Sequence, residues 1–358
     1  MSLCARSFVA SLCAVCSLVA AAGLPAFAGP TLLLEAASGR VLYADEQDNQ
    51  WFPASLTKMM TAYLTFDALK KGRLKLTDPV PVSEKAHVQP PSKIGLPVGS
   101  EISVDIAIRA LVVKSANDVA IMLAEKVGGT EEDFVRLMND TAKRLGMTRT
   151  HFVNPNGLPV AGQVSTARDL ATLARAVLRD FPEHNALWGM SEFHLGKLRL
   201  RSHNGLLRSF EGADGIKTGF ICDSGFNVVA SATRDGLRLI AVVLGEPSGK
   251  DRNARAASLL EHGFETASWK AAFGAPSLDR LPIDPAARPV QSVRSSVTAW
   301  NCNGKKPVRK ARRKPRRPTA RGGAKTPHAA QGRQSAGRKA TAATTQPAPA
   351  KSAQQPSK

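Results

Sequence analysis

The sequence predicts an α+β domain in which one antiparallel sheet is built from both ends of the domain. Short runs of strand-forming residues stand near residue 31 and again after residue 216, and helical periodicity fills the region between them. Beyond Trp300 the composition changes to Lys, Arg, Pro, Ala, Gln, Ser and Gly, with almost no large apolar residue. That segment cannot bury enough apolar surface to offset its ordering entropy, so we expect it to be disordered.

The first 28 residues have the pattern of a secretory signal. Arg6 gives a positive start, Phe8 to Ala22 is apolar, and Ala26-Phe27-Ala28 is a small-residue cleavage site. An apolar run of about 15 residues is short for a membrane span, and no later run reaches about 18. We therefore expect an exported, soluble protein that begins at Gly29. A lipoprotein that begins at Cys16 is a weaker alternative, because it would cut the apolar run short.

The chain opens with a predicted β-hairpin, in which Thr31 to Ala36 and Val41 to Ala44 flank a turn that contains Gly39. A helix is predicted next, from Ser55 to Lys70, because apolar residues recur there at three- and four-residue spacing. These residues are Leu56, Met59, Met60, Tyr63 and Leu64.

Helix also dominates the middle of the chain. A second helical region is predicted from Ser103 to Val127. Thr130-Glu-Glu-Asp133 is typical of a helix N-terminus, and a further helix should follow Ser165 or Thr166 and run to Leu178.

Strands return towards the end of the domain. Ile216 to Phe220, Asn227 to Ala232 and Leu237 to Leu244 form a predicted meander, with Asp235-Gly236 as a tight hairpin turn. A last helix is predicted from Asn253 to His262.

The formal charge of +20 is concentrated at the C-terminus. From Lys305 to Lys358 there are 16 Lys and Arg and no acidic residue, and 20 − 16 leaves only +4 for the rest of the chain. We expect this tail to attach to an anionic partner, either membrane lipid or acidic wall polymer. The alternative is a solvated linker.

Only two cysteines, Cys222 and Cys302, lie beyond the predicted signal. They are too few for a disulfide-built fold but could form one bond in an oxidising compartment, or remain two free thiols. Stability must therefore come from a hydrophobic core, for which residues 29–270 are long enough.

Three polar motifs occur in order along the chain: Ser55-Leu-Thr-Lys58, Ser115-Ala-Asn117 and Lys217-Thr-Gly219. Taken singly, each would be an ordinary helix cap, polar turn or strand end. Together, in this order and in these structural contexts, they indicate a serine nucleophile that is activated by a lysine.

The spacing of Ser55 and Lys58 explains how the pair could work. Residues three apart on a helix lie on one face and within mutual reach. A serine hydroxyl needs a base, and a lysine can be that base only if burial or a nearby cation such as Lys217 lowers its pKa. A helix start at Ser55 would also direct free N–H groups towards an oxyanion.

The chain resembles the D-alanyl-D-alanine carboxypeptidases of the low-molecular-mass penicillin-binding type over nearly all of Thr31 to Phe264. The resemblance implies a β-lactamase/DD-peptidase-like fold: an antiparallel sheet flanked by helices, a mostly helical subdomain, and the serine in the cleft between them. The most similar stretches are Pro53–Thr61, His151–Leu158, Ser165–Asp169 and Gly215–Phe220. The domains expected on this basis are a signal peptide (1–28), a catalytic domain (29–270), a C-terminal extension (271–304) and the disordered basic tail (305–358).

The resemblance also implies a role for each motif residue. Ser55 would be the acylated nucleophile, with Lys58 as its general base and Ser115 relaying the proton to the leaving amine. Asn117 would hydrogen-bond the substrate's amide backbone. Lys217 would shape the electric field around the two serines.

Four more residues would bind the substrate on the same basis. Thr218 would help to hold the terminal carboxylate, and Gly219 would leave room for the peptide along the strand edge. The N–H of Phe220 would form the oxyanion hole together with that of Ser55. Arg252 would pair with the terminal carboxylate, for which a guanidinium fork is suited, although a surface arginine is the alternative.

Other chemistries fit the sequence less well. His203 invites a Ser-His-Asp interpretation, but no G-x-S-x-G motif is present and Lys58 already fills the base role. No H-E-x-x-H or paired C-x-x-C occurs, so no metal and no other cofactor is implied. Asn156 and Asp169 are expected to support the architecture of the site.

The function that the resemblance implies is a serine-type D-Ala-D-Ala carboxypeptidase of the periplasm or cell envelope, which acts on peptidoglycan stem peptides and is inhibited by β-lactams. A DD-endopeptidase of the same fold is an alternative. A β-lactamase is less favoured, because Asn154-Pro-Asn-Gly157 offers no carboxylate for deacylation. A secreted polyanion-binding protein would explain the tail but not the motifs, and no nucleic-acid partner is expected.

Overall fold

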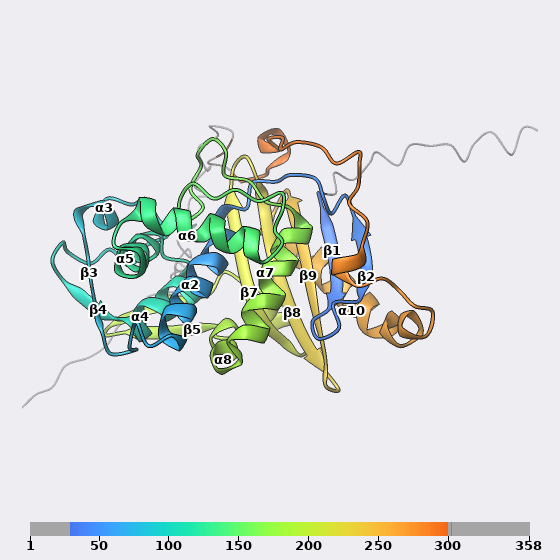
Figure 1. Cartoon of the computed structure of the whole chain (residues 1–358), viewed down its shortest axis with the longest axis horizontal. Coiled ribbons are helices and arrows are strands. Elements are labelled where there is room, and N and C mark those ends of the chain that lie inside the picture. The colour runs from blue at the N-terminus through green and yellow to red at the C-terminus, as the bar shows by residue number, and fades with distance from the viewer. Residues whose placement is uncertain (1–28, 300–301, 303–358) are drawn as a thin grey trace, which may run out of the picture. The chain divides into compact units, whose positions relative to one another are not determined.

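The computed structural model describes residues 29–299 and Cys302. Its centre is a five-stranded antiparallel sheet with helices on both faces (Figure 1). The predicted signal and the predicted disordered tail lie outside the described residues. In their order across the sheet, the strands are β2 (Val41–Asp45), β1 (Thr31–Glu35), β9 (Leu237–Glu246), β8 (Gly225–Arg234) and β7 (Ala213–Ile221).

The sheet joins the two ends of the domain, as the sequence predicts. β1 pairs with β2 in the opening hairpin and with β9 on its other side, so that Leu33 lies opposite both Tyr43 and Ala241. Between β8 and β9, Asp235 and Gly236 have φ angles of 49° and 77°, which suit the predicted tight hairpin turn. β7 is left at the edge of the sheet, next to the helical part of the molecule.

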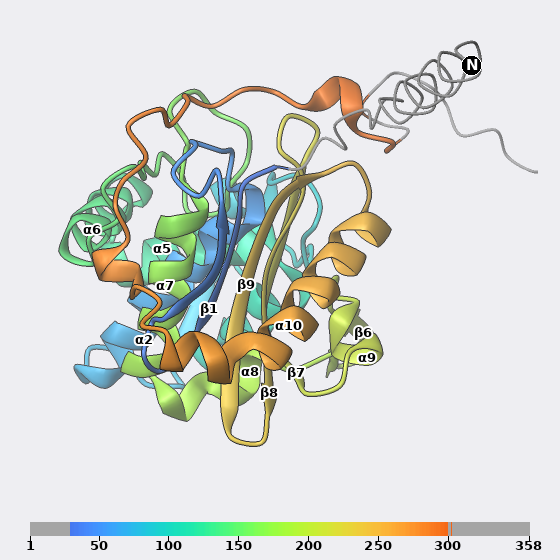
Figure 2. The same ribbon diagram turned by 90° about the vertical axis from the view of Figure 1, so that its right-hand side faces the viewer.

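Successive residues of β1 face two separate apolar cores, as expected for a strand that is covered on both sides. Leu32 and Leu34 belong to the core that includes α7 (Ala167–Asp180), whereas Leu33 belongs to the core under α10 (Gly249–Ala272). Figure 2 shows α10 lying across one face of the sheet, with α7 behind the strands. The sheet is therefore a rigid support for residues placed on β7.

α10 is longer than the predicted helix over Asn253 to His262. It begins directly after the N-cap residue Ser248 and continues well past Gly263. Gly263 does not end the helix, because its missing Cβ lets α10 pack closely on the sheet: a Cβ there would come within 2.7 Å of a leucine side chain. The helix consequently runs through residue 270, the predicted limit of the domain.

A mostly helical subdomain lies to one side of the sheet (Figure 1). The predicted helix over residues 55–70 starts as a 3-10 turn, so Lys58 is its first α-helical residue. The predicted helical region over 103–127 is interrupted at Ser115, because its left-handed φ of 59° cannot continue a helix. The elements here are η1 (Ala54–Thr57), α2 (Lys58–Lys70), α3 (Glu84–His87), α4 (Val104–Arg109), the π-helical turn η2 (Ala110–Lys114), α5 (Asn117–Gly128) and α6 (Glu131–Arg144).

The helix starts predicted at Thr130 and at Ser165 or Thr166 are both present, and Thr166 is the N-cap of the second helix. Each threonine Oγ1 accepts a hydrogen bond from the backbone N–H three residues later, at 3.0 Å. Several short elements are not predicted, because three or four residues carry too little periodicity to be recognised. They include α3, the hairpins β3 (Pro79–Pro81) with β4 (Glu101–Ser103) and β5 (Glu192–Leu195) with β6 (Leu198–Arg201), and the helices α8 (Asn185–Trp188) and α9 (Leu206–Ser209).

After α10 the chain passes back across the domain as a segment that we call the C-terminal strap, residues 276–299 with Cys302 (Figure 2). Its side chains Leu278, Val293 and Val297 are buried in the same core as α7 and the sheet. At its start, the N–H of Leu278 donates to the carbonyl of Gly39 at 2.8 Å. The strap is therefore part of the folded domain.

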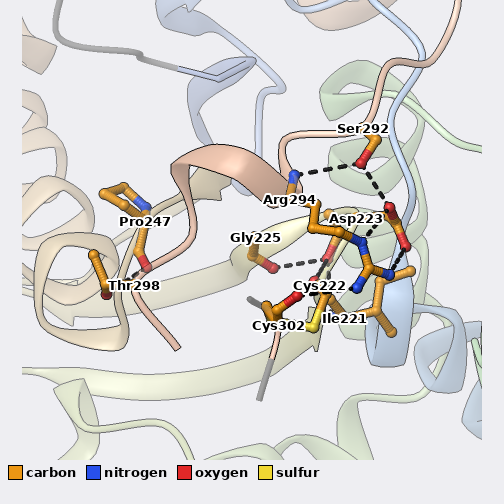
Figure 3. The surroundings of a disulfide bond; sticks show 10 residues. Ile221, Cys222, Asp223, Gly225, Pro247, Ser292, Arg294, Thr298 and Cys302 are labelled. Carbon is orange, nitrogen blue, oxygen red and sulfur yellow. Dashed lines mark hydrogen bonds and ion pairs between the residues drawn. A yellow bond between two sulfur atoms is a disulfide. The ribbon is translucent and has the colours of Figure 1, made fainter. Parts of the chain in front are cut away.

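A buried ion pair holds the middle of the strap. The Arg168 guanidinium contacts Asp48 and also donates to the carbonyls of Leu281 and Pro282, at 2.9 and 2.8 Å. At the end of the strap, Cys302 forms a disulfide with Cys222 in the β7–β8 turn (Figure 3). None of the described helices combines the length and the apolar character that a membrane span requires.

Candidate active site

The three sequence motifs converge on one cleft. Ser55 lies in η1 and Lys58 begins α2; Ser115 and Asn117 stand where η2 gives way to α5, and Lys217-Thr-Gly219 lies on β7. The cleft has a volume of about 400 Å³. The predicted site residues that line it are Ser55, Ser115, Asn117, Thr218, Gly219, Phe220 and Arg252.

Lys58 is buried directly beneath Ser55. Its Nζ lies 3.0 Å from Ser55 Oγ, 2.7 Å from Asn117 Oδ1 and 2.6 Å from the carbonyl of Asn156. Burial, helped by the positive charge of Lys217, holds the pKa of Lys58 well below its ordinary value. A neutral amine here can donate to the amide and carbonyl oxygens and still present its lone pair to the Ser55 hydroxyl, so it can accept that proton.

Two glycines let the neighbouring segments approach the Ser55 turn closely. A Cβ at Gly157 would lie 1.8 Å from the carbonyl oxygen of Ala54, and Gly157 has a φ of 80°. A Cβ at Gly219 would lie 2.8 Å from the carbonyl of Pro53 and 3.1 Å from the amide nitrogen of Ser55. Because Gly219 has no side chain, η1 can pack directly against β7. This is a second reason for a glycine at this position, besides the expected room for a peptide substrate.

Ser115 is fixed by Lys217. Lys217 Nζ donates to Ser115 Oγ at 2.8 Å and to the carbonyl of Thr218 at 3.0 Å. Burial and the nearby charge of Arg252 lower the pKa of Lys217 to about 7. Ser115 has left-handed backbone angles (φ 59°, ψ 39°), which a non-glycine residue adopts only at some cost, of order 1 to 3 kcal/mol. That conformation and the Lys217 contact together aim the hydroxyl into the cleft.

Asn117 is braced by a loop that the sequence does not single out. Its Nδ2 donates to the carbonyl of Pro90 at 2.9 Å, and its backbone N–H donates to the carbonyl of Ser92 at 2.7 Å. Its Oδ1 is occupied by Lys58. The second N–H of its carboxamide is the group left to meet a substrate. Pro91 and Ser92 also line the cleft.

Arg252 is not a surface arginine, because it is 5% exposed and lines the cleft. Its guanidinium donates to the carbonyl of His203 at 3.2 Å and to Asn253 Oδ1 at 2.8 Å. Burial lowers its pKa to about 10. No carboxylate among the described residues forms an ion pair with Arg252, so its charge is available to an anionic ligand.

The remaining candidates lie around this centre. His203 lines the cleft, and its described contact is the backbone one with Arg252. Asn156 supports Lys58 through its carbonyl, and its Nδ2 donates to Gln89 at 3.0 Å. Asp169 accepts from Thr150 Oγ1 at 2.7 Å outside the cleft lining, and burial raises its pKa to about 6.

Other cleft-lining residues carry no recognisable signal in the sequence. Ile221, Phe226 and Gly249 belong to no motif and are brought in by sheet pairing and by the start of α10. No group of three or more His, Cys, Asp or Glu side chains within the described residues could hold a metal ion. The cleft itself brings together a serine, a buried lysine and an arginine that forms no ion pair within the described part of the chain.

A family model described as D-alanyl-D-alanine carboxypeptidase matches residues 20–248. The chain belongs to this family. It is 41% identical over 240 residues to a D-alanyl-D-alanine carboxypeptidase of Escherichia coli (DacC), covering 65% of this chain and 60% of the relative. It is 37% identical to one of Bacillus subtilis (DacF), covering 65% and 61%. The chain thus spans about 60% of the length of the curated relatives that it matches.

Solved structures of this family share the fold. Penicillin binding protein 5 from Haemophilus influenzae superposes with a TM-score of 0.65 at 37% identity, covering 66% of this chain and 71% of that one. Penicillin-binding protein D2 from Listeria monocytogenes, in a cefotaxime-bound form, superposes with a TM-score of 0.61 at 32% identity, covering 66% and 97%. The predicted DD-peptidase fold is confirmed.

Proposed function

We propose that this protein is a serine-type D-Ala-D-Ala carboxypeptidase that releases the terminal D-alanine of peptidoglycan stem peptides and is inhibited by β-lactams. The observation that carries the proposal is the buried Lys58 Nζ, 3.0 Å from Ser55 Oγ, in a cleft that also holds Arg252, which has no carboxylate partner among the described residues. The family to which the chain belongs supports it. The relatives named above carry this activity in their names.

The first half of the reaction forms an ester on Ser55. Lys58 takes the hydroxyl proton while Oγ attacks the carbonyl carbon of the penultimate D-alanine. The negative oxygen is stabilised by the N–H groups of Ser55 and Phe220, on two backbone segments that Gly219 brings together. The C–N bond then breaks, and the proton that Lys58 accepted passes through Ser115 to the departing amine, which leaves Lys58 neutral again. Water afterwards hydrolyses the ester and restores the hydroxyl.

The charge of the cleft selects a substrate with a free terminal carboxylate. Arg252 and Thr218 reach the cleft from α10 and β7, and Arg252 has no carboxylate partner of its own among the described residues. A D-Ala-D-Ala terminus supplies the missing negative charge, whereas an internal peptide bond does not. This favours carboxypeptidase over endopeptidase activity. The carboxylate of a β-lactam would occupy the same place.

Mass spectrometry of penicillin-treated protein tests the proposal. We expect one covalent adduct per chain, and its tryptic peptide should carry the added mass at Ser55. Ser55→Ala should show no adduct and should release no D-alanine from a diacetyl-lysyl-D-alanyl-D-alanine tripeptide. An adduct that persists in Ser55→Ala would rule the assignment out.

The pH profile tests the partnership of the two lysines. Lys217→Gln removes a cation that lowers the pKa of Lys58, so the pKa of Lys58 rises and the base stays protonated to higher pH. The acidic limb of kcat/KM should therefore move to higher pH in Lys217→Gln. Its position is diagnostic, because loss of the Ser115 contact alone would lower the whole curve without moving the limb. An unmoved limb would contradict the coupling.

We also propose that the protein is exported to the periplasm or cell envelope, with residues 305–358 as a basic tail. The expected catalytic domain (29–270) and extension (271–304) are better treated as one folded unit, because α10 crosses residue 270 and the strap packs into the domain core. The signal pattern of residues 1–28 supports export. The 16 uncompensated charges of the tail support attachment to membrane lipid or acidic wall polymer. Cosedimentation of full-length and tail-deleted protein with anionic vesicles at low salt tests the attachment, since equal binding would exclude it.

A further inference from the structure

We propose that the end of the C-terminal strap, residues 292–299 with Cys302, is a positioning element of the substrate cleft. It connects the β7–β8 turn to the link between β9 and α10. It thereby fixes the distance between β7, which carries Thr218, and the start of α10, which carries Arg252, the two residues proposed to hold the substrate carboxylate. The proposal rests on the proposed function, because that function makes the spacing matter.

The first set of contacts joins the strap to Asp223 in the β7–β8 turn (Figure 3). The Asp223 carboxylate accepts from Ser292 Oγ at 2.6 Å and from the Arg294 guanidinium at 2.7 Å. Its backbone carbonyl accepts from the N–H of Val293 at 3.0 Å. The adjacent residue Cys222 is bonded covalently to Cys302. One short turn thus meets the strap through two side chains, a backbone bond and a disulfide.

The second set of contacts joins the strap to Pro247, in the short link between β9 and α10. The carbonyl of Pro247 accepts from both the N–H and the Oγ1 of Thr298, each at 3.0 Å. Pro247 directly precedes Ser248, the N-cap residue of α10. Arg252 stands four residues beyond that cap. Between Val293 and Cys302, therefore, the strap bridges the strand that carries Thr218 and the helix that carries Arg252.

Both of the bridged segments form the wall of the cleft. Ile221 and Phe226, on either side of the turn, line it together with Gly249 at the start of α10. Phe226 stacks on Phe220 with ring centroids 4.2 Å apart, and a Cβ at Gly249 would sit 3.6 Å from the Phe226 ring. The β7–β8 turn, the two stacked rings and the start of α10 therefore pack together as one block, and the strap contacts both the turn and the residue ahead of the α10 cap.

The Ser55–Lys58 pair does not belong to this block. It is held by α2 and by the contacts of Lys58 with Asn117 and Asn156. The N–H of Phe220, the proposed oxyanion donor, belongs to the block, but it is also held by the pairing of β7 with β8. Loosening the tie should therefore disturb the binding of the terminal carboxylate more than the chemical step at Ser55. The expected signature is a higher KM with little change in kcat.

Arg294 and Arg288 offer a matched pair of variants. Both are strap arginines that pair with a carboxylate, Asp223 and Glu46 respectively, and their side chains are 50% and 56% exposed. Only Arg294 lies at the tie. We expect Arg294→Ala and the double variant Cys222→Ser with Cys302→Ser to raise KM for the tripeptide about fivefold or more, with kcat within about twofold. Arg288→Ala should match the wild type, and Arg294→Lys should recover part of the loss.

Hydrogen–deuterium exchange of the full-length protein gives a readout that does not depend on activity. Amides of residues 220–227 and 247–253 should exchange faster in Arg294→Ala and in the double cysteine variant than in Arg288→Ala. Unchanged exchange, or an equal rise of KM in Arg288→Ala, would overturn the proposal. If the disulfide-bonded wild type neither forms a penicillin adduct nor releases D-alanine, the proposed function fails instead, and the exchange data still decide whether the strap is a tie.

Discussion

Lys58→Arg should abolish acylation of Ser55 by penicillin, slowing it by about a thousandfold or more. The variant keeps a basic side chain at this position, but that side chain is protonated and cannot act as a base. A guanidinium is a far weaker acid than an ammonium and stays protonated near neutral pH, so it cannot take the serine proton. The larger guanidinium would also have to fit into the space of the Lys58 Nζ, which already has three oxygen neighbours at 2.6 to 3.0 Å. Raising the pH should not restore the reaction.

Stopped-flow labelling with a fluorescent penicillin measures this loss. Lys70→Arg is the matched control, because Lys70 lies at the other end of the same helix and its Nζ donates to the carbonyl of Asp180 at 2.9 Å, outside the cleft. It should label at the wild-type rate. If Lys58→Arg also labels at that rate, Lys58 is not the base.

The parts of the site that sequence predicts best are those fixed by local geometry. Ser55 and Lys58 are three residues apart in sequence. The expected first helical turn is a 3-10 turn in the structure, and Lys58 Nζ still lies 3.0 Å from Ser55 Oγ. The sheet was predictable for a related reason: its strands are short runs of apolar and β-branched residues, and the Asp235-Gly236 turn carries its own signal. The resemblance that the three motifs carry then implied that their segments should meet in one cleft.

What sequence does not predict depends on contacts between distant segments. The hydroxyl of Ser115, a residue with a left-handed backbone, is held by Lys217, about a hundred residues later, through a hydrogen bond of 2.8 Å. Pro90 and Ser92 hold Asn117 from a loop without a motif. Gly263 resembles a helix end in sequence, and only its packing against the sheet shows why α10 continues. In each case a partner far along the chain decides the local conformation.

Arg252→Ala should lower kcat/KM for a peptide ending in D-Ala-D-Ala about 100-fold, chiefly through KM. That factor corresponds to about 2.7 kcal/mol, within the range for a hydrogen-bonded charge. Arg252 is buried and lacks a carboxylate partner among the described residues, so the substrate carboxylate is the group that would pair with it. Arg255→Ala is the control on the same helix, because Arg255 pairs with Glu246 at 2.8 Å and does not line the cleft.

A second substrate separates charge recognition from support of the fold. The same peptide with its terminal carboxylate converted to an amide should be a poor substrate for the wild type, close to the level of Arg252→Ala acting on the acid. Replacing Arg252 should then cost little more with the amide, because the amide has already removed the ion pair. If Arg252→Ala instead lowers turnover of the acid and the amide by the same factor, the guanidinium acts by holding His203 and Asn253 in place, and the preference for a free terminus must come from elsewhere in the cleft.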